Sequence, residues 1–119
     1  MALPNVHIVA NSFIWDKAGR LQAVREPIIH VYNKDETVLP KFPFFSKIKS
    51  RRQVVLIGDS LGDANMAKGM PHDLVVKIGF LNEDDPSHLA AYRRAFDVVI
   101  LGDASFYFIN QWFKTLVNR

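Results

Sequence analysis

The sequence contains no cysteine, which excludes a disulfide framework and any metal site built on thiolates. It has no apolar run that approaches the ~20 residues needed to span a bilayer. Its first residues also lack the charged and apolar segments of a signal peptide. These absences predict a cytoplasmic protein with no membrane partner. The length of 119 residues corresponds to one small domain or less.

Basic residues exceed acidic residues only slightly, and the formal net charge is +3. The basic residues gather in one place, at Lys47, Lys49, Arg51 and Arg52. Such a cluster either binds nucleic acid or forms the solvated end of a helix. Because no interleaved aromatic residues accompany it, we favour the solvated helix end and expect no nucleic-acid partner.

The most informative stretch is residues 54–63, which read VVLIGDSLGD. Its first four residues are apolar, and this pattern is typical of a strand buried on both faces. A turn follows at Asp59 and Asp63, and residues 64–68 are expected to form a short helix. In an open α/β sheet, ligands bind beyond the carboxyl ends of the strands. Two carboxylates there, with water and phosphate as further ligands, predict a Mg²⁺ site.

A simpler interpretation of the two acids is also open. Asp59 would be only the N-cap of the following helix, and Asp63 an exposed acid in its first turn. However, a glycine precedes each acid, at Gly58 and Gly62, and glycine favours a sharp turn or a close approach to a ligand. We therefore favour the metal site.

Strands and helices alternate along the second half of the chain, and this alternation predicts an α/β fold with a parallel sheet. Pro40 and Pro43 mark an irregular connection before it. The expected elements are a strand at 6–11, a hairpin of 13–16 and 21–26, a short helix at 44–48, strands at 54–57, 74–80 and 97–101, a helix at 86–95 with Asp85 as its N-cap, and a last helix opening at 102.

Helical spacing in the last helix predicts an apolar stripe of Phe106, Ile109, Phe113 and Leu116, with Trp112 beside it. We interpret this stripe as part of the core. The histidines show no spacing typical of metal ligands and are expected to be structural or surface residues; they are His7, His30, His72 and His88.

Six segments in order resemble the C-terminal part of the eukaryotic cytosolic pyrimidine 5′-nucleotidase family (type III cytosolic 5′-nucleotidase), within the haloacid dehalogenase superfamily. The resemblance covers nearly the whole chain. The segments are Asn5–Asn11, Ile29–Lys34, Val54–Asp63, Met66–Gly69, Lys77–Asn82 and Phe96–Leu101.

This resemblance implies a partial Rossmann-like haloacid dehalogenase core over residues 1–119, in a Mg²⁺-dependent phosphatase that hydrolyses nucleoside 5′-monophosphates to nucleoside and phosphate. It implies that Asp59 and Asp63 hold Mg²⁺. Lys34 would neutralise the nucleophile and the phosphoryl group, as a catalytic and phosphate-binding residue. Ser60 would help to bind phosphate, unless its hydroxyl is only a helix N-cap. Lys34 could alternatively be an ordinary exposed lysine in a loop.

The chain departs from the family pattern in two places. The residues after Lys34 are Asp35, Glu36 and Thr37, where family members usually have His-Asp-Gly. The DxDxT motif that supplies the aspartate nucleophile is absent, as are the second-motif strand and the cap that reads the base. Since the reaction proceeds through an aspartyl-phosphate, we expect the chain alone to be inactive.

Two other function classes stay open from the sequence. One is a non-catalytic α/β module that binds phosphate or a protein, because the strand at 54–57 would have an unpaired edge. A receiver-like or P-type-ATPase-like phosphorylation domain is less favoured, since it also needs the missing nucleophile. The chain would be a fragment, a short product with a rearranged sheet, or one part of an assembly with a complementing chain or a second copy.

Overall fold

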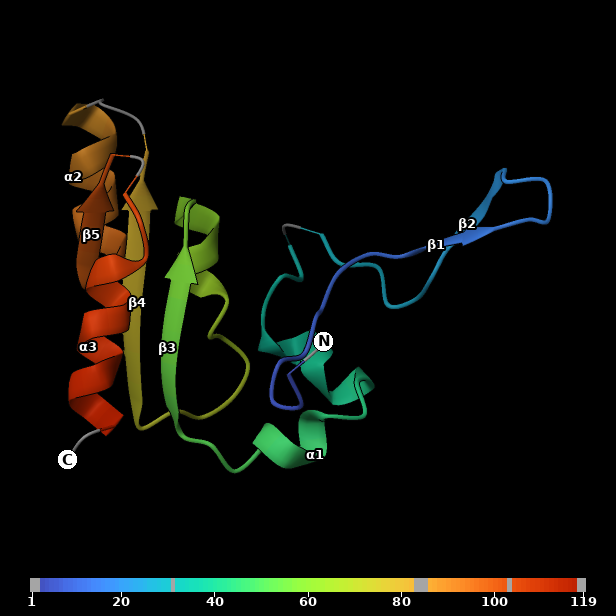
Figure 1. Ribbon diagram of the computed structural model, residues 1–119, viewed down its shortest axis with the longest axis horizontal. Helices are drawn as coiled ribbons and strands as arrows, with labels where there is room; N and C mark the ends of the chain where they lie inside the picture. Colours follow the sequence, from blue (N-terminus) through green and yellow to red (C-terminus); the bar gives the residue numbers. More distant parts are fainter. Residues whose placement is uncertain (1–2, 31, 83–85, 103, 118–119) are drawn as a thin grey trace. The chain divides into compact units, whose positions relative to one another are not determined.

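The computed structural model describes residues 3–30, 32–82, 86–102 and 104–117. The described residues within 1–54 and 65–75 form one compact unit, and those within 55–64 and 76–119 form a second. In chain order the elements are β1 (Phe13–Trp15), β2 (Leu21–Val24), the 3-10 helix η1 (Glu36–Lys41), α1 (Phe45–Ile48), β3 (Gln53–Gly58), the 3-10 helix η2 (Leu61–Asn65), β4 (Leu74–Leu81), α2 (Pro86–Ala95), β5 (Val98–Leu101) and α3 (Tyr107–Val117) (Figure 1). Within the described residues, none of these helices has the length and apolar character to cross a membrane.

The second unit is built on a three-stranded sheet in the order β3-β4-β5. Strands β4 and β5 pair in parallel, with Ile78 opposite Val98 and Leu81 opposite Leu101. The arrows of all three strands point the same way in Figure 1. The predicted α/β fold with a parallel sheet is therefore confirmed.

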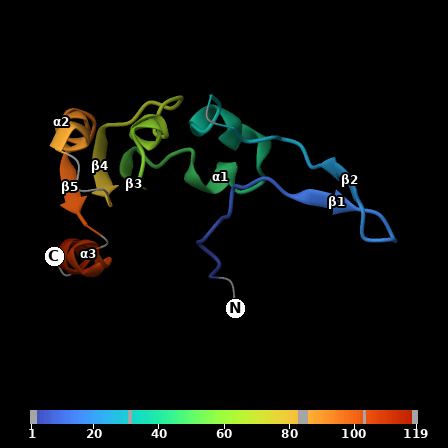
Figure 2. The same ribbon diagram turned by 90° about the horizontal axis from the view of Figure 1, so that it is seen from above.

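Strand β4 is covered on both faces, which explains its nearly continuous apolar sequence. On one face Ile78 and Phe80 form a buried cluster with Ile109 of α3. On the other face Gly79 leaves room for Phe96, whose ring would lie 2.7 Å from a Cβ atom at position 79. Figure 2 shows α2 and α3 on opposite faces of the sheet. This packing holds the carboxyl end of β4 beside that of β3.

The first unit contains the predicted hairpin. Strands β1 and β2 are antiparallel, with Phe13 opposite Val24. The Asp16 carboxylate accepts hydrogen bonds from the backbone N–H groups of Ala18 and Arg20, at 2.8 and 2.9 Å. The bond from the Arg20 N–H contributes most to lowering the pKa of Asp16. Gly19 closes the turn with φ +75°, a conformation that glycine adopts without strain.

Three predicted elements differ in the structure. Residues 6–11 do not form a strand, since no strand of the described chain pairs with them. The connection at 36–41 is not irregular but forms η1, which buries Val38. The helix predicted at 64–68 is replaced by η2, which begins earlier, at Leu61. Secondary structure at these places depends on neighbours that the local pattern does not contain.

The last helix begins at Tyr107 and not at Gly102, which has φ +71° and ends the preceding strand region. Only part of the predicted apolar stripe is buried: Ile109 is 1% exposed and Trp112 packs against the same cluster. The other three members are exposed by 37% or more, although the ring centroid of Phe106 lies 5.1 Å from that of core Phe80; they are Phe106, Phe113 and Leu116. The predicted core stripe is therefore confirmed for Ile109 and Trp112 and wrong for Phe113 and Leu116. The expected N-cap Asp85 lies outside the described residues.

Candidate functional site

The turn after β3 depends on a close approach between its glycine and its second acid. A Cβ atom on Gly58 would lie 2.3 Å from the Cβ atom of Asp63 and 2.9 Å from its Oδ2 atom. Only glycine fits such a contact. The same test at Gly62 finds only the Ser60 hydroxyl, at 3.7 Å. The contact with Asp63 therefore requires a glycine at position 58, whereas no such contact exists at position 62. The predicted approach of a ligand to these glycines stays a prediction.

Asp63 is buried inside the turn, with 3% of its surface exposed. Its Oδ2 atom accepts hydrogen bonds from the backbone N–H groups of Asp59, at 3.2 Å, and Ser60, at 3.1 Å. Its own N–H donates to the Ser60 carbonyl at 3.0 Å. Bonds from amides to a carboxylate are stronger than neutral ones. Through these hydrogen bonds Asp63 fixes the backbone conformation of the turn at Asp59 and Ser60.

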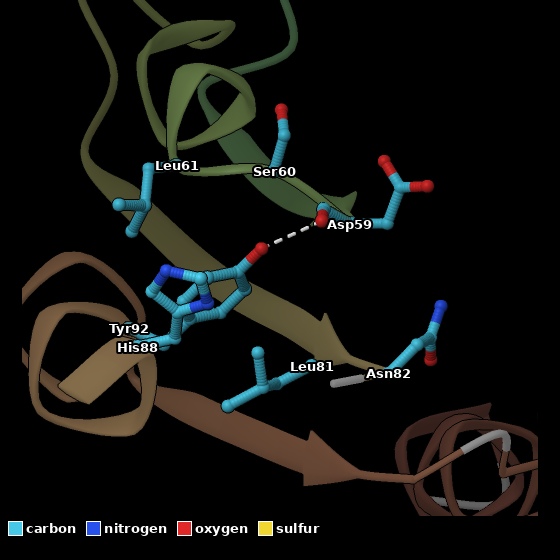
Figure 3. A pocket seen from close by; sticks show the side chains of 7 residues that line it. All are labelled: Asp59, Ser60, Leu61, Leu81, Asn82, His88 and Tyr92. Atoms are coloured by element: carbon cyan, nitrogen blue, oxygen red, sulfur yellow. Dashed lines mark hydrogen bonds between the residues drawn. The ribbon is translucent and has the colours of Figure 1, made fainter. Parts of the chain in front are cut away.

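Asp59, by contrast, is exposed directly after the carboxyl end of β3. Its carbonyl oxygen accepts a hydrogen bond of 2.6 Å from the hydroxyl of Tyr92 on α2. Figure 3 shows its carboxylate directed away from Tyr92. The simpler interpretation of the two acids is therefore wrong, because Asp63 is the buried acid that accepts the backbone amides and Asp59 is the exposed one.

Beside Asp59 lies an open pocket of about 470 Å³. The residues that line it come from the turn, the end of β4 and one face of α2; they are Asp59, Ser60, Leu61, Leu81, Asn82, His88 and Tyr92 (Figure 3). The sequence analysis did not single out Asn82 or His88 as site residues. Asn82 directly follows a strand, and His88 precedes Tyr92 by one helical turn, so strand ends and helix faces could have indicated both.

Ser60 contributes its backbone N–H, which donates to Asp63. The side chain is exposed and lines the pocket. Within the described chain its hydroxyl makes no hydrogen bond to the first turn of η2, and in Figure 3 it points away from Tyr92 and His88. The N-cap alternative for this hydroxyl is not supported.

Lys34 belongs to the first unit, where it is exposed in the loop before η1. With Asp35 and Glu36 it lines a second pocket of about 200 Å³, whose remaining walls are apolar and consist of Val9, Ile29, Val38, Leu39 and Met66. The structure thus brings Asp59, Ser60 and Asp63 together in one unit and places Lys34 in the other.

The residues of the turn fit a hard cation. No group of three His, Asp or Glu side chains converges anywhere in the described parts of the chain. The Asp59 carboxylate is exposed and open to a ligand, while Oδ2 of Asp63 already accepts two backbone amides. Mg²⁺ is commonly bound by one or two carboxylates and otherwise by water and phosphate. This donor set fits Mg²⁺ with Asp59 as its direct ligand and Asp63 as the support of that ligand.

Comparisons with known proteins place the chain in one family. A family model described as pyrimidine 5′-nucleotidase (UMPH-1) matches residues 1–117. The 7-methylguanosine phosphate-specific 5′-nucleotidase of Gallus gallus is 37% identical over 108 residues, which are 90% of this chain and 37% of that protein. The putative cytosolic 5′-nucleotidase 3 of Caenorhabditis elegans is 36% identical over 107 residues, 86% of this chain and 28% of that protein.

A solved structure shows the same fold. The crystal structure of cytosolic 5′-nucleotidase IIIB bound to cytidine superposes with a TM-score of 0.83 at 32% identity, over 98% of this chain and 39% of that one. The chain therefore spans well under half the length of the relatives that it matches. The haloacid dehalogenase type of α/β fold implied by the sequence resemblance is confirmed. The chain belongs to the pyrimidine 5′-nucleotidase (UMPH-1) family.

Proposed function

We propose that this chain is the metal-binding part of a Mg²⁺-dependent 5′-nucleotidase that acts on nucleoside 5′-monophosphates. The observation that carries the proposal is the turn after β3, where buried Asp63 fixes the backbone that presents exposed Asp59. The family membership supports the substrate class, since the relatives are named as 5′-nucleotidases. One relative is named a cytosolic enzyme, which supports a cytoplasmic location.

Each residue then has a distinct role. Asp59 is the direct Mg²⁺ ligand, and Asp63 keeps its backbone in place. Mg²⁺, when bound, supplies positive charge that stabilises the phosphoryl oxygens as they gain charge. The family resemblance alone assigns Lys34 a second positive charge for the phosphoryl group, and it assigns Ser60, which directly precedes η2, a contact with phosphate. None of these groups is a nucleophile, so their contribution is electrostatic stabilisation and positioning.

We expect the purified 119-residue chain to release no phosphate from nucleoside 5′-monophosphates, because an aspartyl-phosphate cannot form without the nucleophile aspartate. The measurement is phosphate release with cytidine and 7-methylguanosine 5′-monophosphates in the presence of Mg²⁺. Turnover that is abolished by Asp59→Asn would contradict this prediction and show that the chain carries a complete active site.

Metal binding is expected to persist in the isolated chain. A Mg²⁺ titration followed by amide NMR should shift the signals of Gly58, Asp59 and Ser60 together. Asp59→Asn should weaken binding at least about tenfold, since even residues that only support a metal ligand contribute that much. Asp97→Asn is the matched control, because Asp97 is also exposed but precedes β5 at the opposite end of the sheet.

If the turn does not respond to Mg²⁺, or if both variants behave alike, the metal role of Asp59 is wrong. The non-catalytic phosphate-binding or protein-interaction module then becomes the better interpretation. The position of β3 at the edge of the described sheet would favour it, because an edge strand has backbone groups open for pairing with another chain.

A further inference from the structure

The first unit contains a buried pair of side chains that the proposed function does not use. Oε2 of Glu36 lies 2.6 Å from Nε2 of His72. The side chain of His72 is 5% exposed and that of Glu36 is 13% exposed. Removal of one partner from such a pair is costly, because the other is left shielded from water without its hydrogen bond. A pair of this kind at the chain's surface would contribute little.

The location of the pair connects it to Lys34. Glu36 follows Lys34 by two residues and opens η1. Its backbone N–H donates to the carbonyl of Lys68 at 2.9 Å. Gly69, with φ +117°, packs so closely on Thr37 that a Cβ atom would lie 2.9 Å from the Thr37 backbone nitrogen. The segment after Lys34 is thus attached to the segment 68–72 through backbone and side chain.

Asp35, which directly follows Lys34, is the N-cap of η1. Its Oδ1 atom accepts hydrogen bonds from the Thr37 backbone N–H, at 2.9 Å, and from the Thr37 hydroxyl. The hydroxyl bond contributes most to lowering the pKa of Asp35. The carboxylate therefore stays ionised at neutral pH and remains an acceptor that caps η1.

The surroundings of the imidazole favour one of its two neutral tautomers. Nδ1 of His72 is buried without a hydrogen-bond partner in the described structure. A proton on Nδ1 would leave a buried donor unpaired, whereas a proton on Nε2 is donated to Glu36. The neighbouring Asp73 forms an exposed ion pair with Arg52, at 2.8 Å, and does not replace Glu36 as the partner.

We propose that Glu36 and His72 are positioning residues that hold the loop carrying Lys34 in its phosphate-binding conformation. This inference rests on the proposed role of Lys34, but the order of the loop can be measured without it. The pair acts through the loop backbone, because both Lys34 and Glu36 line the same pocket and only Glu36 extends into the buried contact with His72.

Amide hydrogen exchange of the full 119-residue chain tests the positioning. Glu36→Ala should accelerate exchange of the Glu36 and Thr37 amides by at least about tenfold, the size expected when a hydrogen bond to a charged group is lost. Glu36→Gln keeps an acceptor for Nε2–H and should restore most of the protection. Asp73→Asn, which removes an exposed ion pair in the same unit, should leave these amides unchanged.

Equal exchange in Glu36→Ala and Asp73→Asn would overturn the proposal. A second measurement uses the unsubstituted chain and does not depend on how a variant folds. The ¹⁵N shifts of His72 should show a proton on Nε2, the nitrogen that faces Glu36, and an Nε2 without a proton would also overturn the proposal.

Titration with inorganic phosphate separates the two proposals. The Lys34 Cε signal should respond in the unsubstituted chain and in Glu36→Gln, and much less in Glu36→Ala. An equal response in Glu36→Ala would overturn the positioning role. If Lys34 is silent even in the unsubstituted chain, the proposed phosphate role of Lys34 fails in this chain, while the exchange rates still decide the role of Glu36.

Discussion

Gly58→Ala will destabilise the second unit by about 3 kcal/mol, the upper part of the range for overpacking a tight contact. The added methyl group would lie 2.3 Å from Asp63 Cβ, far inside contact distance, so β3 or η2 must move. Neither can move freely, because Asp63 is hydrogen bonded to the amides of Asp59 and Ser60. Thermal unfolding should show a midpoint at least about 10 °C lower.

The chain offers a matched control four residues later. Gly62→Ala adds the same methyl group in the same turn, but the only neighbour would be the Ser60 hydroxyl at 3.7 Å, an ordinary contact. Its midpoint should stay within the range of a neutral surface change. If the two alanine variants unfold alike, the close packing of Gly58 on Asp63 is not what requires a glycine after β3.

Asp63→Ala is expected to cost about 3 kcal/mol, because it leaves the backbone N–H groups of Asp59 and Ser60 without their acceptor in a partly buried turn. Asp63→Asn keeps an oxygen at the same place and should cost only about 1 kcal/mol, mainly from the loss of charge. Urea unfolding of the two variants measures this difference. Both should also weaken Mg²⁺ binding, since the support of Asp59 is altered.

Asp59→Asn should affect metal affinity but not stability, in contrast to the Asp63 variants. The Asp59 carboxylate is exposed and directed away from Tyr92, so we expect almost no change in stability but a large loss of Mg²⁺ affinity. Measurements of stability and Mg²⁺ affinity on the same variants therefore distinguish the structural role of Asp63 from the metal-binding role of Asp59. A stable Asp63→Ala variant together with an unstable Asp59→Asn variant would reverse the roles that the structure assigns to them.

Much of the fold could be predicted from local patterns. The apolar run of β3, the glycine and acids that follow it, and the alternation of strands and helices to the end of β5 were sufficient for the parallel α/β sheet. These elements have strong local signals because strands buried on both faces are apolar along their whole length. Elements without such signals were missed, as η1 and the late start of α3 show.

The sequence predicted that Asp59 and Asp63 follow β3 in one turn, and the structure places both there, but the sequence did not distinguish their surroundings. Asp59 and Asp63 were equivalent in the sequence, and only the structure shows one exposed and one buried. His88 and Asn82 line the pocket because α2 packs beside β4. The spacing of the histidines in the sequence did not indicate that His88 lies there. The pairing of Glu36 with His72 joins positions 36 residues apart.

The sequence by itself determined the class of fold, the turn of two acids at the end of β3 and the resemblance that the family match confirms. These properties are carried by contiguous residues, whose spacing is set by the geometry of strand, turn and helix. Only the tertiary structure decided which acid faces solvent, which glycine is sterically required and that His72 pairs with Glu36. The first two outcomes depend on close packing inside the turn of residues 58–63, and the third depends on a contact between positions 36 residues apart. Such contacts leave no periodic pattern in the chain.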